Sequence, residues 1–119
     1  MTDALKLDFA KMDGLLPAIV QDAESGQVLM VGFLNETSYA NTLQTGFVTF
    51  WSRTRQKLWM KGETSGNRLR VVSAVTDCDQ DAVVFRVTVE GDGLVCHEGT
   101  VSCFTRAIAL PAAANTEAR

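Results

Sequence analysis

The heptapeptide Thr76-Asp77-Cys78-Asp79-Gln80-Asp81-Ala82 joins two runs of residues that are typical of β-strands. The run before it, Leu69–Val75, is rich in β-branched residues. In the run after it, from Val83 to Glu90, apolar and polar positions alternate with the period of a half-buried strand. The heptapeptide is therefore predicted to be the connection of a β-hairpin, and this hairpin is the centre of a β-rich fold.

The hairpin connection carries carboxylates on alternate residues, Asp77, Asp79 and Asp81, with the thiol of Cys78 between the first two. Like charges this close repel one another, and a bound divalent cation would convert the repulsion into coordination. The carboxylates suit a hard cation, whereas a thiol is a soft ligand that suits a different ion. The alternative is an acidic, solvated turn, because Asp is a common turn residue.

The composition predicts one soluble, cytoplasmic domain. The chain has 119 residues, a length that leaves no room for a second domain. Its formal net charge is −3. No apolar stretch approaches the length of a membrane span, and the sequence from Met1 to Asp13 lacks the pattern of a signal peptide. The absence of basic runs argues against a nucleic-acid partner. A small β-rich chain gains buried surface by pairing with a copy of itself.

The other segments predict an α+β fold that is rich in strands. Asn35 is a typical helix N-cap and Gly46 a typical helix stop, so a helix of about ten residues is expected between them. Apolar runs beside turn residues predict further strands at Pro17–Asp22, Gln27–Phe33, Phe47–Trp51 and Leu58–Met60. We therefore expect a mixed or antiparallel sheet of about five main strands with one or two short helices.

The chain is expected to form a single domain, residues 1–119, with a core at about residues 15–104. The two ends are expected to lie outside this core. In residues 1–14, Leu5, Phe9 and Met12 have helical spacing and Gly14 is a stop, which predicts a short amphipathic helix. The segment Pro111–Arg119 is small, polar and rich in alanine, and it is expected to be frayed.

The segment Cys96-His97-Glu98-Gly99-Thr100-Val101-Ser102-Cys103 holds two of the three cysteines and the only histidine. An odd number of cysteines in a chain of cytosolic type favours metal binding or a reactive thiol over disulfides. The alternative is that the cysteines are small buried hydrophobic residues. With Cys78, the segment offers three sulfur ligands, which suit zinc.

The role of His97 decides which kind of zinc site is expected. Structural sites close with four protein ligands, whereas catalytic sites use three and keep one position for water. If His97 is a ligand, the site is closed. If it is not, the site is open and the imidazole can move protons near the metal. His97 directly follows Cys96, and it would have to turn sharply to bind the same ion, which favours the open site.

The loop Lys61-Gly62-Glu63-Thr64-Ser65-Gly66-Asn67 can form a nest of backbone N–H groups for a phosphate, with help from Arg53 or Arg55. The alternative is an ordinary turn with basic residues that solvate the end of a hairpin. Trp51 and Trp59 have rings that can stack on a base, although aromatic residues on strands are more often in the core.

Taken together, these motifs closely resemble those of the phosphoribosyl-AMP cyclohydrolase family of histidine biosynthesis. The resemblance runs from about Leu15 to Phe104, and the motifs stand in the family's order and spacing. They are Trp51-Ser52-Arg53, Lys61-Gly62-Glu63-Thr64-Ser65-Gly66-Asn67, Asp77-Cys78-Asp79-Gln80-Asp81-Ala82 and Cys96-His97-Glu98-Gly99 through Ser102-Cys103-Phe104.

The resemblance implies an intertwined homodimer that opens the adenine ring of 1-(5-phosphoribosyl)-AMP by adding water at the N1–C6 bond, with zinc-bound water as the nucleophile. It implies that Cys78 of one subunit and Cys96 and Cys103 of the other hold zinc. The aspartates of the hairpin connection would hold magnesium, and His97 would assist proton transfer. The residues implied in binding the phosphoribosyl nucleotide are Trp51, Ser52, Arg53, Lys61, Thr64, Ser65, Gly66 and Asn67.

The competing hypothesis is a non-catalytic, zinc-stabilised β domain that acts as an interaction module. A purely structural zinc site would need neither the acidic hairpin connection nor His97. The presence of both favours the enzyme.

Overall fold

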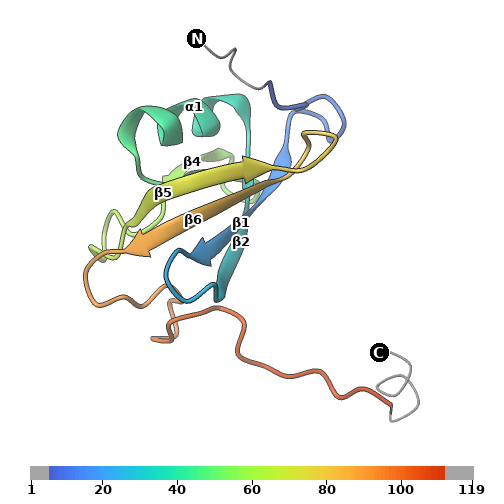
Figure 1. Ribbon diagram of the computed structural model, residues 1–119. Coiled ribbons are helices and arrows are strands. Elements are labelled where there is room, and N and C mark those ends of the chain that lie inside the picture. Colours follow the sequence, from blue (N-terminus) through green and yellow to red (C-terminus); the bar gives the residue numbers. More distant parts are fainter. Residues whose placement is uncertain (1–5, 112–119) are drawn as a thin grey trace.

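The computed structural model describes residues 6–111, which contain one helix and six strands. Figure 1 shows a twisted sheet with the helix on one side and an extended segment that leads to the C-terminal end. The elements are β1 (Leu16–Asp22), β2 (Val28–Leu34), α1 (Glu36–Thr45), β3 (Thr49–Ser52), β4 (Lys57–Met60), β5 (Leu69–Thr76) and β6 (Val83–Val89). Among these residues, no helix is long and apolar enough to cross a membrane.

Four strands form a mixed sheet in the order β2-β1-β6-β5. The predicted hairpins β1–β2 and β5–β6 are confirmed as antiparallel pairs, and the central strands β1 and β6 run parallel with Ala18 opposite Val83. Alternate residues of both central strands are buried, as the period of two requires. The buried side chains of these two strands are Leu16, Ala18, Val20, Val83, Phe85 and Val87.

Helix α1 begins and ends as the sequence predicts. The Asn35 side chain accepts a hydrogen bond of 2.8 Å from the Ser38 N–H, and the Ser38 hydroxyl accepts one of 2.9 Å from the Asn35 N–H, which completes a capping box. Gly46 ends the helix with φ of 82°, a left-handed conformation that favours glycine. The hydroxyl of Thr42 then accepts a bond of 2.9 Å from the Thr49 N–H, which holds the helix against β3.

The predicted N-terminal helix is wrong for the residues that the structure describes, since Lys6–Gly14 contains turns but no helix; Met1–Leu5 lies outside them. The segment is held by contacts with distant parts of the chain. The Asp8 N–H donates to the Gln80 carbonyl at 2.7 Å, and Phe9 packs on Tyr39 with ring centroids 6.1 Å apart. These long-range contacts replace the bonds of a helix.

The expected sheet of about five main strands is also corrected, because β3 and β4 form a separate two-stranded sheet. They pair with each other, with Phe50 opposite Trp59, and β3 packs on β2. Gly32 of β2 permits this close packing, since a Cβ atom there would overlap the ring of Phe50. The predicted frayed tail, Pro111–Arg119, lies outside the described residues except for Pro111.

Candidate active site

A cavity of about 550 Å³ lies between the loop after β4 and the segment that carries Cys96 and His97. Positive charge lines one part of it, and hydroxyl groups and an imidazole line others. Its lining residues include Arg55, Lys57, Trp59, Lys61, Thr64, Ser65, Asn67, Cys96 and His97. The structure thus brings the predicted phosphate loop and the predicted proton-transfer residue to one place.

The predicted phosphate loop, Lys61–Asn67, is folded tightly on itself. The Gly66 N–H donates a hydrogen bond of 2.8 Å to the Gly62 carbonyl, and the Asn67 N–H donates one of 3.2 Å to the Ser65 hydroxyl. Gly62 has φ of 83°, and a Cβ atom there would overlap the backbone of Asn67. Only glycine fits this position, so the loop keeps a compact shape on the cavity wall.

The segment Cys96–Cys103 is a turn that places two thiols side by side. The Cys96 N–H donates to the Thr100 carbonyl at 3.1 Å, and the Cys103 N–H donates to the Leu29 carbonyl of β2 at 2.8 Å. The thiols of Cys96 and Cys103 are close enough for each to shift the pKa of the other. The backbone N–H of Glu98 lowers the pKa of Cys96, whereas burial and then the neighbouring Cys96 raise the pKa of Cys103.

The third predicted zinc ligand, Cys78, lies in the turn between β5 and β6, at the opposite end of β6 from Cys96 (Figure 1). Strand β6 has seven residues, and at about 3.3 Å per residue it alone spans about 20 Å. In residues 6–111, the three thiols of one chain therefore do not meet, and Cys78 is exposed.

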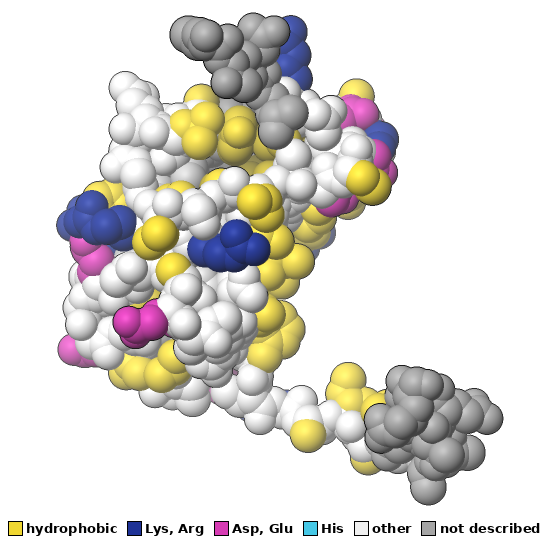
Figure 2. All heavy atoms as spheres, in the orientation of Figure 1, with side chains coloured by type: hydrophobic (Ala, Val, Ile, Leu, Met, Phe, Trp, Pro, Cys, Tyr) yellow, Lys and Arg dark blue, Asp and Glu magenta, His cyan; other side chains and the backbone are white. Residues whose placement is uncertain are grey.

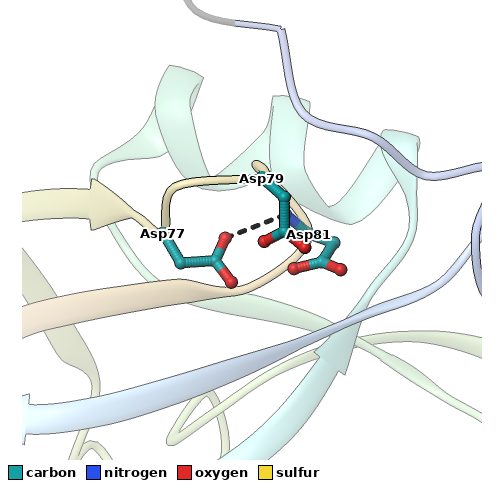
Figure 3. Close-up of side chains that lie close together, drawn as sticks. All are labelled: Asp77, Asp79 and Asp81. Atoms are coloured by element: carbon teal, nitrogen blue, oxygen red, sulfur yellow. Dashed lines mark hydrogen bonds between the residues drawn. The ribbon is translucent and has the colours of Figure 1, made fainter.

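The three aspartates of the same turn do come together, with carboxylate oxygens within 4.8 Å of one another (Figure 3). One Asp77 oxygen accepts hydrogen bonds from the N–H groups of Asp81 and Ala82, at 3.0 and 3.2 Å. A hydrogen bond shared with Asp77 raises the pKa of Asp81, because the carboxylates crowd one another. We call Asp77, Asp79 and Asp81 the acidic turn.

Sequence reasoning missed Lys11, which contacts the acidic turn. Its ammonium lies 3.2 Å from Asp79 Oδ2 and 3.4 Å from Asp81 Oδ2. The hydrogen bond to Asp79 raises the pKa of Lys11. The acidic turn therefore already binds a positive charge of the chain itself. Its carboxylate oxygens are the ligands that a hard metal ion prefers, so the turn fits a site for such an ion. No local pattern could reveal this contact, because about seventy residues separate its partners.

The motif Trp51-Ser52-Arg53 does not line the large cavity, and neither does Gly66. The Arg53 guanidinium lies 4.0 Å from the ring centroid of Phe33. Ser52 lines a neighbouring cavity of about 280 Å³ together with Thr54, Arg55 and Trp59, of which the last two also line the large cavity. The roles in binding substrate stay predictions for all eight residues, those that line the large cavity (Lys61, Thr64, Ser65 and Asn67) included.

Comparison with known proteins gives one consistent result. The family model described as phosphoribosyl-AMP cyclohydrolase matches residues 30–105. The phosphoribosyl-AMP cyclohydrolase of Solibacter usitatus is 58% identical over 102 residues, which are 86% of this chain and 80% of that protein. That of Geotalea uraniireducens is 55% identical over 100 residues, 84% of this chain and 79% of the relative. The bifunctional histidine biosynthesis protein of Escherichia coli is 54% identical over 99 residues, 83% of this chain and 48% of its own length.

Proposed function

Because the chain belongs to the phosphoribosyl-AMP cyclohydrolase family, we propose that it opens the adenine ring of 1-(5-phosphoribosyl)-AMP by hydrolysis of the N1–C6 bond in histidine biosynthesis. One observation carries the proposal beyond the family. A single cavity joins groups that suit a phosphate to Cys96 and His97, which suit the hydrolytic chemistry.

The cavity suits an anionic nucleotide. Arg55, Lys57 and Lys61 provide positive charge on its wall, and Thr64 and Ser65 provide hydroxyl donors. Charge-assisted hydrogen bonds of this kind are the strong ones in phosphate recognition. A phosphate held at this wall would direct the rest of the substrate along the cavity toward His97.

The neighbouring thiols of Cys96 and Cys103 suit zinc, because thiolates are preferred ligands of this metal. A pair is one ligand short of an open catalytic site, and Cys78 of the same chain is at the far end of β6. The third ligand in our proposal is therefore Cys78 of the partner subunit. When bound, zinc would supply the Lewis acidity that activates a water molecule at neutral pH.

A homodimer is the assembly that this shared site requires. Strand β5 is the last strand of the sheet. Its first residues bond to residues 46–48, as the Val71 N–H does to the Gly46 carbonyl at 2.8 Å, and beyond them Val72 and Val75 are exposed. Phe104, Ile108 and Leu110 of the extended segment are also exposed, and Figure 2 shows apolar side chains uncovered on the body and along that segment. Apolar surface and an open strand edge both favour association.

Magnesium is proposed for the acidic turn, because carboxylate oxygens are its preferred ligands and the turn already attracts the Lys11 ammonium. Cys78 is a member of the same turn. A dimer that brings Cys78 to the partner's Cys96 would thus also bring the acidic turn to the partner's cavity. A cation there would neutralise the negative charge of the substrate.

His97 is proposed as the residue that moves the proton. Ring opening joins the oxygen of water to C6 and breaks the C6–N1 bond, so a proton must leave the water and one must reach N1. The imidazole lines the cavity and has one nitrogen that can accept the first proton and one that can donate the second. A positioned acid or base of this kind typically contributes about 100- to 10,000-fold in rate.

An absorbance assay tests this function against the competing hypothesis of a non-catalytic zinc-stabilised domain. Purified protein is incubated with phosphoribosyl-AMP, and the change in ultraviolet absorbance on ring opening is followed with and without a chelator. The enzyme proposal predicts turnover that the chelator abolishes and that added zinc and magnesium restore. No turnover with both metals replete would contradict it.

A further inference from the structure

Asn67, the last residue of the phosphate loop, bonds across the cavity wall to the turn that precedes Cys96. Its side-chain amide N–H donates a hydrogen bond of 3.0 Å to the Leu94 carbonyl, and its side-chain carbonyl oxygen accepts one of 2.9 Å from the Asp92 N–H. Leu94 is two residues before Cys96. The amide therefore links the two walls of the cavity through backbone groups that are far from it in sequence.

Two glycines leave the space that Asn67 fills. A Cβ atom on Gly62 would overlap the backbone carbonyl of Asn67, and one on Gly91 would overlap its side-chain oxygen. The turn at Gly91 is thus packed directly against the amide. This packing restricts both the rotamer of Asn67 and the path of the chain toward Cys96.

We propose that Asn67 is a positioning residue of the cyclohydrolase, whose amide sets the distance between the phosphate loop and the turn that leads to Cys96 and His97. The inference rests on the proposed function. Both polar atoms of the amide are bonded to backbone, so its effect passes through the turn and not through a contact with substrate. A displacement of about 1 Å between a bound substrate and the reacting groups can lower a rate by about 100-fold.

The test compares two substitutions that break the link with one that does not. Asn67→Ala removes the amide, and Gly91→Ala displaces it while Asn67 remains. Gly93→Ala is the matched control, because Gly93 has φ of 77° in the same turn but no atom lies within 4 Å of a Cβ atom placed there. Gly91 has φ of 69°, so both alanines carry similar backbone strain.

In steady-state kinetics, Asn67→Ala and Gly91→Ala should each lower kcat by about 10- to 100-fold and change KM by less than about threefold, while Gly93→Ala stays near wild type. In the double variant Asn67→Ala/Gly91→Ala, kcat should be no lower than in whichever single variant has the lower kcat, because both changes break the same contact. A raised KM with unchanged kcat in Asn67→Ala would overturn the inference. Multiplied losses in the double variant, or equal effects of Gly91→Ala and Gly93→Ala, would also overturn it.

Amide hydrogen exchange makes the test independent of activity. Asn67→Ala should speed exchange in residues 92–96 and leave the β5–β6 hairpin unchanged; unaltered exchange in residues 92–96 would contradict the link even in a protein without turnover. If Asn67→Ala fails to fold, Asn67→Asp, which keeps the acceptor and loses the donor, takes its place in the same measurements. An inactive wild type would contradict the proposed function alone.

Discussion

The ammonium of Lys11 lies 3.2 Å from the carboxylate of Asp79, and it thereby places a positive charge of the chain at the acidic turn. It also lies 3.4 Å from Asp81 Oδ2. A divalent cation that binds these carboxylates would compete with the ammonium for the same oxygen atoms. Lys11 is therefore expected to weaken metal binding at the turn.

Lys11→Met should raise the affinity of the acidic turn for magnesium, because the competing cation is removed. Exposed ion pairs are weak because water screens them, so the expected gain is only about two- to tenfold. Isothermal titration calorimetry of the metal-free protein with magnesium chloride measures it. Lys6→Met is the matched control, because Lys6 forms no ion pair among the residues that the structure describes. Equal affinities of Lys11→Met and wild type would show that the ammonium does not compete.

His97→Ala should lower kcat by about 100- to 10,000-fold while the protein keeps its zinc, because our assignment makes the imidazole a proton carrier and not a ligand. Metal analysis of the purified variant, beside its steady-state kinetics, checks both parts. Loss of zinc would instead indicate a closed, structural site with His97 as the fourth ligand.

The pH dependence of stability should report the ion pairs of Glu90. Arg70 donates a hydrogen bond of 2.6 Å to Glu90, and Arg68 lies 3.1 Å from its other oxygen. The Arg70 hydrogen bond lowers the pKa of Glu90 from its ordinary value of 4.5. A lowered pKa in the folded state means stability that is present above the unfolded pKa and is lost as the pH falls through the folded pKa.

Glu90→Gln should therefore be less stable than wild type at pH 7, and the difference should shrink as the pH falls below about 4.5. Urea unfolding of both proteins across this range measures the difference. Glu24→Gln provides a control, because Glu24 forms no ion pair within residues 6–111. A difference between wild type and Glu90→Gln that is constant with pH would mean that Glu90 acts by packing and not by its charge.

Local signals in the sequence predicted the elements of this fold well. The hairpin around the acidic turn followed from the period-two alternation after Val83, and helix α1 followed from its caps, Asn35 and Gly46. These features depend on residues that are neighbours along the chain. The motif resemblance added the expectation that the phosphate loop and His97 serve one site, and the cavity brings them together.

Features that depend on distant contacts were not predicted. Phe9 and Met12 have the spacing of a helix, but Phe9 instead packs on Tyr39 and Met12 is largely exposed. The division into two sheets depends on the fit of Phe50 against Gly32, which no strand pattern encodes. Likewise, the sequence alone could not show that the length of β6 keeps Cys78 away from Cys96 in one chain.

The central claim is that a second copy of the chain completes the zinc site, and a mixing experiment tests it most directly. Cys78→Ala and Cys96→Ala proteins should each be inactive, because three thiolates are the minimum for an open zinc site. When the two are mixed and exchange subunits, a mixed dimer has one site with both lesions and one with neither. The account predicts that activity returns in the mixture. If mass spectrometry confirms exchange and the activity stays at background, the zinc site is not shared between subunits and the account is wrong.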